Sequence, residues 1–582
     1  MPSDDKSSPR PAAFGMMEML RVWKGNWARL GGAQSPTAAA LAWTEFCFRL
    51  AGSPSHLMQV AADTLDAGKA MAGRLCRPGR KDWVFRPDED DRRFRYPGWS
   101  RFPFSLFAQA QLAAEALWRE TALGTAGLGP VEARRVEFLG RFALNAIAPV
   151  NFPWTNPEIV DACLESFGAN LVKGQQLLAE DVERLTLRER LPGLEDYVPG
   201  KTVAVQPGRV VYRNALMEII QYAPSTETVW RQPVLIVPAW LMKFYILDLT
   251  PRDSLIHYLV GRGHTVFVVS WKNPGADMAS VTFDDYRRDG VMVAIDIVEA
   301  IVPGQKIQIV GYCLGGTVVA IAAAAMADQR DDRLASVTLL AAQTDFSEVG
   351  DMMLFVDESQ VRLLEDLMHV QGFLDTRQMS TAFYALRTNE MVFARMVERY
   401  LLGRAVAPAD IDAWLADPTR IPERTHSDYL RRLFLDNSFA RGAYQVDGRP
   451  VGPADIDLPV FLLGAERDHV APWRSVFRTA FAISGPATFV LTGGGHNTGI
   501  VSPPDKPKAS FRRFVRASSA RPPEPDAWAE KAVREPGSWW PAWVDWLEAH
   551  SSPLRGPAPP MGTVRRGLPP LEPAPGHYVA ET

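Results

Sequence analysis

The sequence has few of the features that mark disulfide-rich, metal-binding, membrane-spanning or nucleic-acid-binding proteins. Its 582 residues include only four cysteines, widely spaced and without a C-x-x-C pair, so it predicts neither a disulfide scaffold nor a zinc site. No run of about 18 apolar residues occurs, and the polar N-terminus lacks the apolar core of a secretory signal. A net charge of −4 without a dense Lys/Arg run argues against nucleic-acid binding. We therefore expect a cytoplasmic protein with no transmembrane segment, in reducing surroundings that suit a free thiol.

One short stretch combines a strand, a tight turn and a helix. Residues 307–310 are mostly β-branched and predict a buried strand, while residues 317–326 have a helix pattern. Between them the turn reads G-x-C-x-G, which is the nucleophile elbow of the α/β-hydrolase layout with cysteine in place of serine. The pattern predicts Cys313 as the nucleophile and the backbone amide of Leu314 as the first oxyanion donor. The alternative is a structural glycine-rich turn with an inert, buried cysteine.

The patterns along the chain divide it into four parts. Residues 1–15 are expected to be disordered, and residues 16–195 carry amphipathic helix patterns that predict a mainly helical N-terminal domain. Residues 196–550 alternate apolar strands with helices, which predicts a mainly parallel sheet covered on both faces. A helical stretch at about 346–451 interrupts this alternation and is expected to form a cap over the site. Residues 551–582 are Pro-rich and predict an extended tail.

The predicted strands of the sheet are short apolar runs bounded by turn residues. They lie at 234–237, 265–269, 307–310, 337–341, 460–463 and 488–491.

A catalytic thiol needs a base, and the base needs an orienting acid. In the hydrolase layout these follow the nucleophile in the order acid, then histidine, on loops after late strands. Asp468 and His496 occupy such loops and are the predicted acid and base. Glu466 competes with Asp468 for the acid role, and Asp468 has loop capping as its alternative. The alternative for His496 is a surface histidine on a flexible loop, and His469 is taken as a neighbour of the site.

A second oxyanion donor is expected from the loop after the strand at 234–237. The backbone amide of Trp240 or of Leu241 is in place to provide it, and no side chain distinguishes the two.

Several sequence blocks together resemble the polyhydroxyalkanoate synthases, in particular the larger kind that works without a partner subunit. The resemblance covers about residues 95–580 and implies Cys313, Asp468 and His496 as the catalytic residues. It also implies polymerisation of (R)-3-hydroxyacyl-CoA, expected to be the short-chain 3-hydroxybutyryl-CoA, with release of CoA. The blocks are APVNFPWTNPE at 148–158, VPAW at 237–240, KFYILDL at 243–249, SWKNP at 270–274, GYCLGGT at 311–317, DHVAPW at 468–473, HNTGIVSPP at 496–504 and GSWW at 537–540.

The resemblance further implies a homodimer, association with the surface of polyester granules, and no metal or other cofactor. Two alternatives remain open on the sequence. One is a thioesterase or polyester hydrolase that uses the same triad. The other is a non-catalytic granule-surface protein on a degenerate hydrolase fold.

Overall fold

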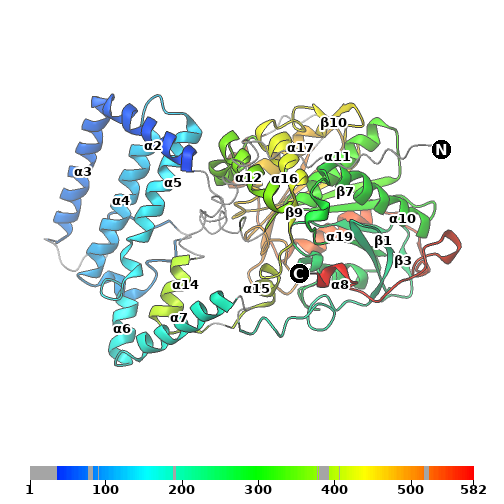
Figure 1. Ribbon diagram of the computed structural model, residues 1–582, viewed down its shortest axis with the longest axis horizontal. Helices are drawn as coiled ribbons and strands as arrows, with labels where there is room; N and C mark the ends of the chain where they lie inside the picture. The colour runs from blue at the N-terminus through cyan, green and yellow to red at the C-terminus, as the bar shows by residue number, and fades with distance from the viewer. Residues whose placement is uncertain are drawn as a thin grey trace, which may run out of the picture.

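The computed structural model describes residues 36–75, 83–88, 91–187, 192–375, 378, 392–405, 407–516 and 523–581. The expected disordered segment 1–15 lies outside these ranges, as do the first helix pattern that follows it and residues 379–391 of the predicted cap. The described chain forms a helical body on one side and a larger body around a sheet on the other (Figure 1). No helix of the described chain combines the length and apolar character needed to cross a bilayer.

The N-terminal body is built from helices, as the sequence predicts for residues 16–195. Several of them begin with proline, because the first amides of a helix have no acceptor within the helix and proline lacks the amide hydrogen. The side chain of Asn156 caps α6 by accepting a hydrogen bond from the amide of Glu158. The helices pack around small apolar clusters, one of which contains Phe46, Ala122 and Val136. They are α2 (Pro36–Ala51), α3 (Pro54–Leu75), α4 (Phe104–Gly124), α5 (Pro130–Ala146), α6 (Pro157–Glu165) and α7 (Ala169–Leu187).

The larger body is organised by a ten-stranded sheet in the order β1-β2-β5-β4-β6-β7-β12-β13-β14-β15. The six inner strands from β5 to β13 pair in parallel, and both edges are antiparallel. All six predicted strands are present among these inner strands. The sheet comprises β1 (Gly208–Arg213), β2 (Met217–Tyr222), β4 (Val234–Val237), β5 (Val266–Trp271), β6 (Ile307–Tyr312), β7 (Leu334–Leu340), β12 (Val460–Ala465), β13 (Ala487–Thr492), β14 (Ser510–Arg516) and β15 (Glu535–Pro536).

Helices cover both faces of this sheet, so its inner strands are apolar at every position rather than at alternate ones. In β4, Leu235 and Val237 belong to the apolar cluster on the face of α10 and α11, and Val234 and Ile236 belong to the cluster on the opposite face. The covering helices are α8 (Leu255–Gly261), α10 (Val293–Ile301), α11 (Leu314–Asp328), α17 (Trp473–Ala482) and α19 (Trp539–Ala549). This is the α/β-hydrolase architecture expected from the sequence.

The predicted cap is a set of short helices and small hairpins between β7 and β12. It contains 3-10 helix η6 (Gly350–Phe355), α12 (Glu358–Gln371), β8 (Phe373–Leu374), α14 (Ala394–Met396), π-helical η8 (Val397–Leu401), α15 (Asp410–Leu415), β9 (Ile421–Pro422), α16 (Glu423–Tyr429), π-helical η9 (Leu430–Leu435), β10 (Tyr444–Val446) and β11 (Arg449–Val451).

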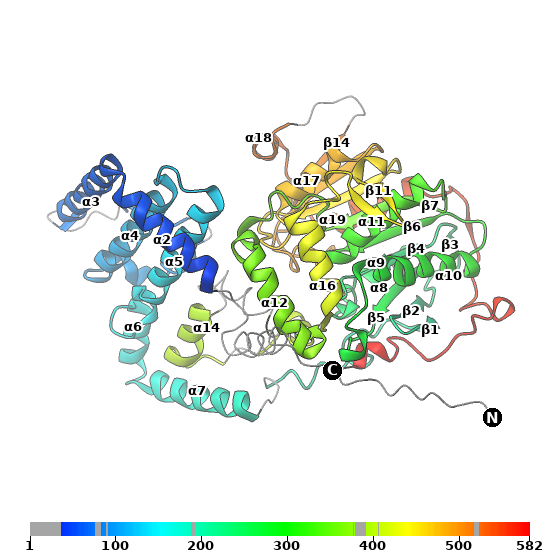
Figure 2. The ribbon, with the colours of Figure 1, turned by 45° about the horizontal axis from the view of Figure 1, so that its top comes forward.

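The N-terminal body contacts this cap in two places. Arg135 of α5 donates to the carbonyl of Leu354 and to the carboxylate of Asp357 at 2.9 Å. Helix α7 packs against η8, where Asp181 accepts hydrogen bonds from Arg399 and from the Tyr400 hydroxyl (Figure 2). The cap is therefore bound to the helical body before and after the part of it that the structure leaves undescribed.

The Pro-rich segment at 551–581 is extended and runs over the sheet body. Arg555 and Gly556 pair with the short strand β3 (Val229–Trp230), and residues 571–574 then follow the free edge of β1. Its far end turns inward, where Tyr578 and Val579 are buried.

Candidate active site

Cys313 lies at the turn between β6 and α11, at the carboxyl end of a central strand. Its backbone has φ 54° and ψ −126°, which confirms the strained conformation expected for a nucleophile elbow. The turn closes only because its neighbours lack side chains. A Cβ on Gly311 would lie 2.3 Å from the Cα of Gly316, and one on Gly315 would lie 2.1 Å from the Val237 carbonyl oxygen. Sharp backbone geometry therefore holds the thiol at the start of a helix.

His496 and Asp468 follow the neighbouring strands β13 and β12. Parallel pairing brings both loops to the carboxyl end of the sheet, where Cys313 also lies. The ring nitrogen Nδ1 of His496 lies 2.7 Å from Oδ2 of Asp468, and both residues are buried. The other carboxylate oxygen of Asp468 accepts the backbone amides of Val470 and Ala471 at 2.8 and 2.9 Å. These amides fix the carboxylate, which in turn fixes the imidazole.

The charges around His496 favour its protonated form. Burial lowers the pKa of His496, but the negative charges of Asp468 and Cys313, with a hydrogen bond from the ring to each, outweigh burial and raise it well above its usual value. Tyr312 stacks on the imidazole with ring centroids 5.7 Å apart and donates its hydroxyl to Asn497 at 2.7 Å. The carboxylate of Asp468 is thus placed to stabilise a proton on His496.

Two backbone elements flank the sulfur. Leu314 is the first residue of α11, and the first amides of a helix have no acceptor within the helix, so its N–H is free for an oxyanion. The loop after β4 carries Trp240 and Leu241, whose carbonyls are bound by Thr419 of the cap. Because those carbonyls are engaged in the cap, the orientation of this loop depends on the cap.

Two family models match the chain. The N-terminus of poly-beta-hydroxybutyrate polymerase (PhaC) matches residues 90–259, and the alpha/beta hydrolase fold matches residues 232–503. A poly(3-hydroxyalkanoate) polymerase of Methylorubrum extorquens is 42% identical over 513 residues, which is 88% of this chain and 83% of that protein. The chain belongs to the poly(3-hydroxyalkanoate) polymerase family.

A second relative agrees with this membership. The poly(3-hydroxyalkanoate) polymerase subunit PhaC of Cupriavidus necator is 35% identical over 84% of this chain and 83% of its own length. Among solved structures, a monoacylglycerol lipase of Paleococcus ferrophilus aligns over 58% of this chain and 99% of the lipase, at 16% identity and a TM-score of 0.32. The family and the acyltransferase class predicted from the sequence are confirmed, and so is the hydrolase fold.

The structure brings the three predicted catalytic residues of this polymerase-family chain together. Glu466, the competitor for the acid role, instead accepts from Arg512 and Arg534. The roles of Leu314, Trp240 and Leu241 as oxyanion donors stay predictions.

Sequence reasoning missed one cap residue near the thiol. Tyr429 of α16 packs against the same apolar cluster as Cys313, and burial, followed by the charge of Cys313, raises the pKa of its hydroxyl well above its usual value. Its position within a helical pattern, with no motif around it, offered no signal.

Proposed function

We propose that the chain polymerises (R)-3-hydroxyacyl-CoA into polyhydroxyalkanoate with release of CoA, through a Cys313–His496–Asp468 triad. The short-chain substrate 3-hydroxybutyryl-CoA is the one expected. The observation that carries the proposal is the buried 2.7 Å contact between His496 and Asp468, at the carboxyl end of the sheet where Cys313 also lies. Membership of the polymerase family supports the same reaction.

In the first half-reaction, the Cys313 thiol gives its proton to His496 and attacks the thioester carbonyl of the substrate. The oxyanion accepts hydrogen bonds from the amide of Leu314 and from that of Trp240 or Leu241. The carbon–sulfur bond to CoA then breaks, and CoA leaves with the proton from His496. The product is an acyl thioester on Cys313, whose energy is close to that of the thioester consumed.

In the second half-reaction, the 3-hydroxyl of an acyl unit gives its proton to His496, which Asp468 orients. The oxygen attacks the acyl-cysteine carbonyl, a new ester forms, and the sulfur of Cys313 leaves and recovers the proton. Water would release the acyl group as free acid, so polymerisation requires a dry site. The aromatic rings around Tyr429 support this requirement: Phe346 and Phe434 come from the cap, and Phe283 comes from the segment between β5 and β6.

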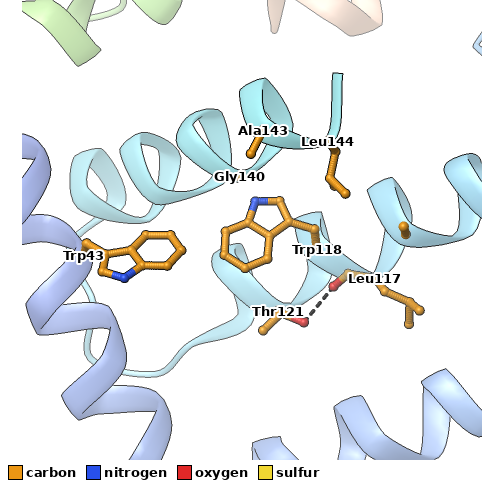
Figure 3. Close-up of a pocket in the computed structure, with 8 residues that line it drawn as sticks. Trp43, Leu117, Trp118, Thr121, Gly140, Ala143 and Leu144 are labelled. Atoms are coloured by element: carbon orange, nitrogen blue, oxygen red, sulfur yellow. Dashed lines mark hydrogen bonds between the residues drawn. The ribbon is translucent and has the colours of Figure 1, made fainter. Parts of the chain in front are cut away.

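We also propose that the N-terminal body contacts the apolar surface of the polymer granule. Large apolar side chains are exposed on its helices and on the turn before α6, with exposed fractions of 76% for Phe48, 74% for Met58 and 72% for Trp154. Helices α2, α4 and α5 line an open pocket of about 380 Å³ in which Trp43 and Trp118 stack with centroids 5.8 Å apart (Figure 3). Granule binding would be tested by co-sedimentation with polyester particles, which we expect Phe48→Asp with Met58→Asp to weaken.

A homodimer is part of the proposal and is implied by the family resemblance alone. Sedimentation velocity at several protein concentrations, with and without substrate, measures it directly. A species with the mass of a single chain at every concentration would contradict it.

The reaction itself is tested by incubating purified protein with (R)-3-hydroxybutyryl-CoA, measuring thiol release and identifying the acyl product. We expect CoA release with insoluble polyester, abolished in Cys313→Ala and retained in Cys47→Ala, because Cys47 is exposed on a helix of the N-terminal body. Release of free 3-hydroxybutyrate would instead establish a thioesterase. Appreciable polymer from Cys313→Ala would refute the assignment of the nucleophile.

A further inference from the structure

The loop that carries Trp240 and Leu241 ends at Lys243, a lysine whose side chain is almost entirely buried. It is 3% exposed, and burial lowers the pKa of its ammonium against the opposing charges of Asp417 and Glu581. The ammonium donates to two backbone carbonyls, those of Tyr578 at 3.1 Å and Glu581 at 2.5 Å. Burying a cation in this way is costly unless its hydrogen bonds are made, so these two carbonyls are a structural requirement for the loop.

The segment that contains Tyr578 and Glu581 also binds a second loop at the carboxyl end of the sheet. The carboxylate of Glu581 accepts the backbone amide of Asn273, two residues beyond the end of β5, at 3.0 Å. Segment 576–581 therefore connects the loop after β4 to the loop after β5. Because β5, β4 and β6 are parallel, both loops emerge at the end of the sheet that carries the elbow, the loop after β4 next to β6 and the loop after β5 one strand further away.

Both anchored residues are also bound to the base of the cap. The indole N–H of Trp414 donates to the carbonyl of Lys243 at 2.7 Å. The side-chain oxygen of Asn273 accepts the backbone amide of Arg420 at 2.9 Å. Cap residues 414–420 are thus held by the same two residues that segment 576–581 holds from the other side.

Segment 576–581 is itself firmly anchored. Glu218 of β2 is fully buried, and its carboxylate accepts the amides of His577 and Tyr578 at 3.0 and 3.1 Å. The Tyr578 hydroxyl donates to the carbonyl of Asn214 at 2.7 Å. The sheet therefore fixes the position of the segment, and the segment in turn fixes the two loops that it binds.

We propose that segment 576–581 is a positioning element for acyl transfer, which fixes the oxyanion loop and the cap base through Lys243 and Asn273. Lys243 is a positioning residue here, because its ammonium is directed at this segment and not at a substrate. The inference rests on the proposed function, since the loop is assigned there as the source of the second oxyanion donor. It goes beyond that function by giving the Pro-rich segment a role in the chemistry.

The test compares two reactions of the same thiol. Attack on a thioester needs both a reactive sulfur and an oxyanion site, whereas alkylation by iodoacetamide needs the sulfur alone. A loss confined to acyl transfer therefore reports the oxyanion loop. Misplacing a catalytic group by about 1 Å costs on the order of 100-fold in rate.

We expect Lys243→Met to lower kcat for CoA release roughly 10- to 100-fold while Cys313 is alkylated at the wild-type rate. Glu581→Ala is the second variant, because it removes the contact with Asn273 and leaves the buried residues of the segment in place. It should show the same pattern with a smaller loss. Arg565→Ala is the matched control, since Arg565 is an exposed residue of the same Pro-rich segment, and it should behave as wild type.

Wild-type kcat in both Lys243→Met and Glu581→Ala would overturn the proposal. Equal losses of acyl transfer and alkylation, with a lowered melting temperature, would also overturn it by showing a purely structural role. The product analysis separates this result from a failure of the proposed function. If wild type releases free acid, polymerisation is wrong, but the same comparison of kcat with alkylation still tests the positioning of the loop.

Discussion

The imidazole of His496 and the carboxylate of Asp468 lie 2.7 Å apart, and neither is open to bulk water. We predict that Asp468→Asn lowers the pKa of His496, because the charge that opposes the effect of burial is removed. Turnover should fall on the order of 10³- to 10⁴-fold, as in other triads that lose the acid. CoA release measures the turnover, and histidine hydrogen exchange read by mass spectrometry measures the pKa.

Glu466→Gln is the control for this variant, because Glu466 lies two residues away and binds arginines instead of the imidazole. It should retain turnover close to that of wild type. The assignment of the acid would be wrong if Glu466→Gln were the inactive variant and Asp468→Asn the active one.

The inner sheet could be predicted because its strands are buried on both faces. Continuous apolar runs such as Val234–Val237 have no other stable location in a protein of this kind. The edge strands gave no such signal. Strand β14, for example, alternates apolar residues with arginines such as Arg512, and its pairing with β13 depends on tertiary context.

The proximity of Cys313, Asp468 and His496 could be predicted because each lies in a local pattern: a glycine-flanked elbow for Cys313 and strand-end loops for Asp468 and His496. The binding of Lys243 had no comparable signal. Its acceptors are main-chain carbonyls more than 300 residues away in the sequence, as the separations of 335 and 338 residues show. Any residue supplies a carbonyl, so residue types alone do not reveal such a contact.

The elbow makes a steric prediction at Gly315. An added Cβ would lie 2.1 Å from the carbonyl oxygen of Val237 and 2.6 Å from that of Pro238, and both are backbone atoms that cannot move without displacing the loop after β4. Gly315→Ala should therefore abolish detectable acyl transfer and lower the free energy of unfolding by roughly 1–3 kcal/mol. Chemical denaturation and CoA release measure the two effects.

Gly261→Ala is the matched substitution, because it lies at the end of α8 and an added Cβ meets nothing within 4 Å. Stability and turnover should match wild type or rise slightly, since alanine favours the helical conformation. An active, stable Gly315→Ala enzyme would show that the elbow and the loop are not in contact.

The contact between the N-terminal body and the cap predicts an effect of Asp181→Asn. Asp181 is buried, and Arg399, Tyr400 and Arg184 surround its carboxylate. Arg399, the largest influence, lowers the pKa of Asp181 together with Tyr400 and Arg184. The ion pair therefore stabilises the fold above the ordinary pKa of an aspartate, and this stabilisation is lost as the pH falls through the lowered pKa.

Removing the charge should destabilise the contact by roughly 1–3 kcal/mol. We expect faster amide exchange in α7 and in Val397–Leu401, measured by hydrogen exchange at neutral pH. The exchange rates of the other helices and strands should not change. Glu180→Gln is the control, because Glu180 is exposed and pairs, among the described residues, with Arg184 at 3.5 Å. Exchange that rose equally in both variants would argue against a specific role for Asp181.

His264 makes the protein sensitive to acid. Its ring is 1% exposed and stacks on Trp230, and within the described chain neither ring nitrogen has a hydrogen-bond partner. Burial chiefly, with Arg262 and Arg555, lowers the pKa of His264 to about 3. Between about pH 6.5 and pH 3 the unfolded chain therefore binds a proton that the folded chain does not, so stability falls as pH falls, by roughly 1.4 kcal/mol per unit of pKa difference.

His264→Phe keeps the ring and removes the proton site, so melting temperatures measured from pH 7 to pH 4 should decline less steeply than in wild type. The exposed His257→Phe should leave the decline unchanged, and parallel curves for wild type and His264→Phe would show that His264 does not carry the acid sensitivity.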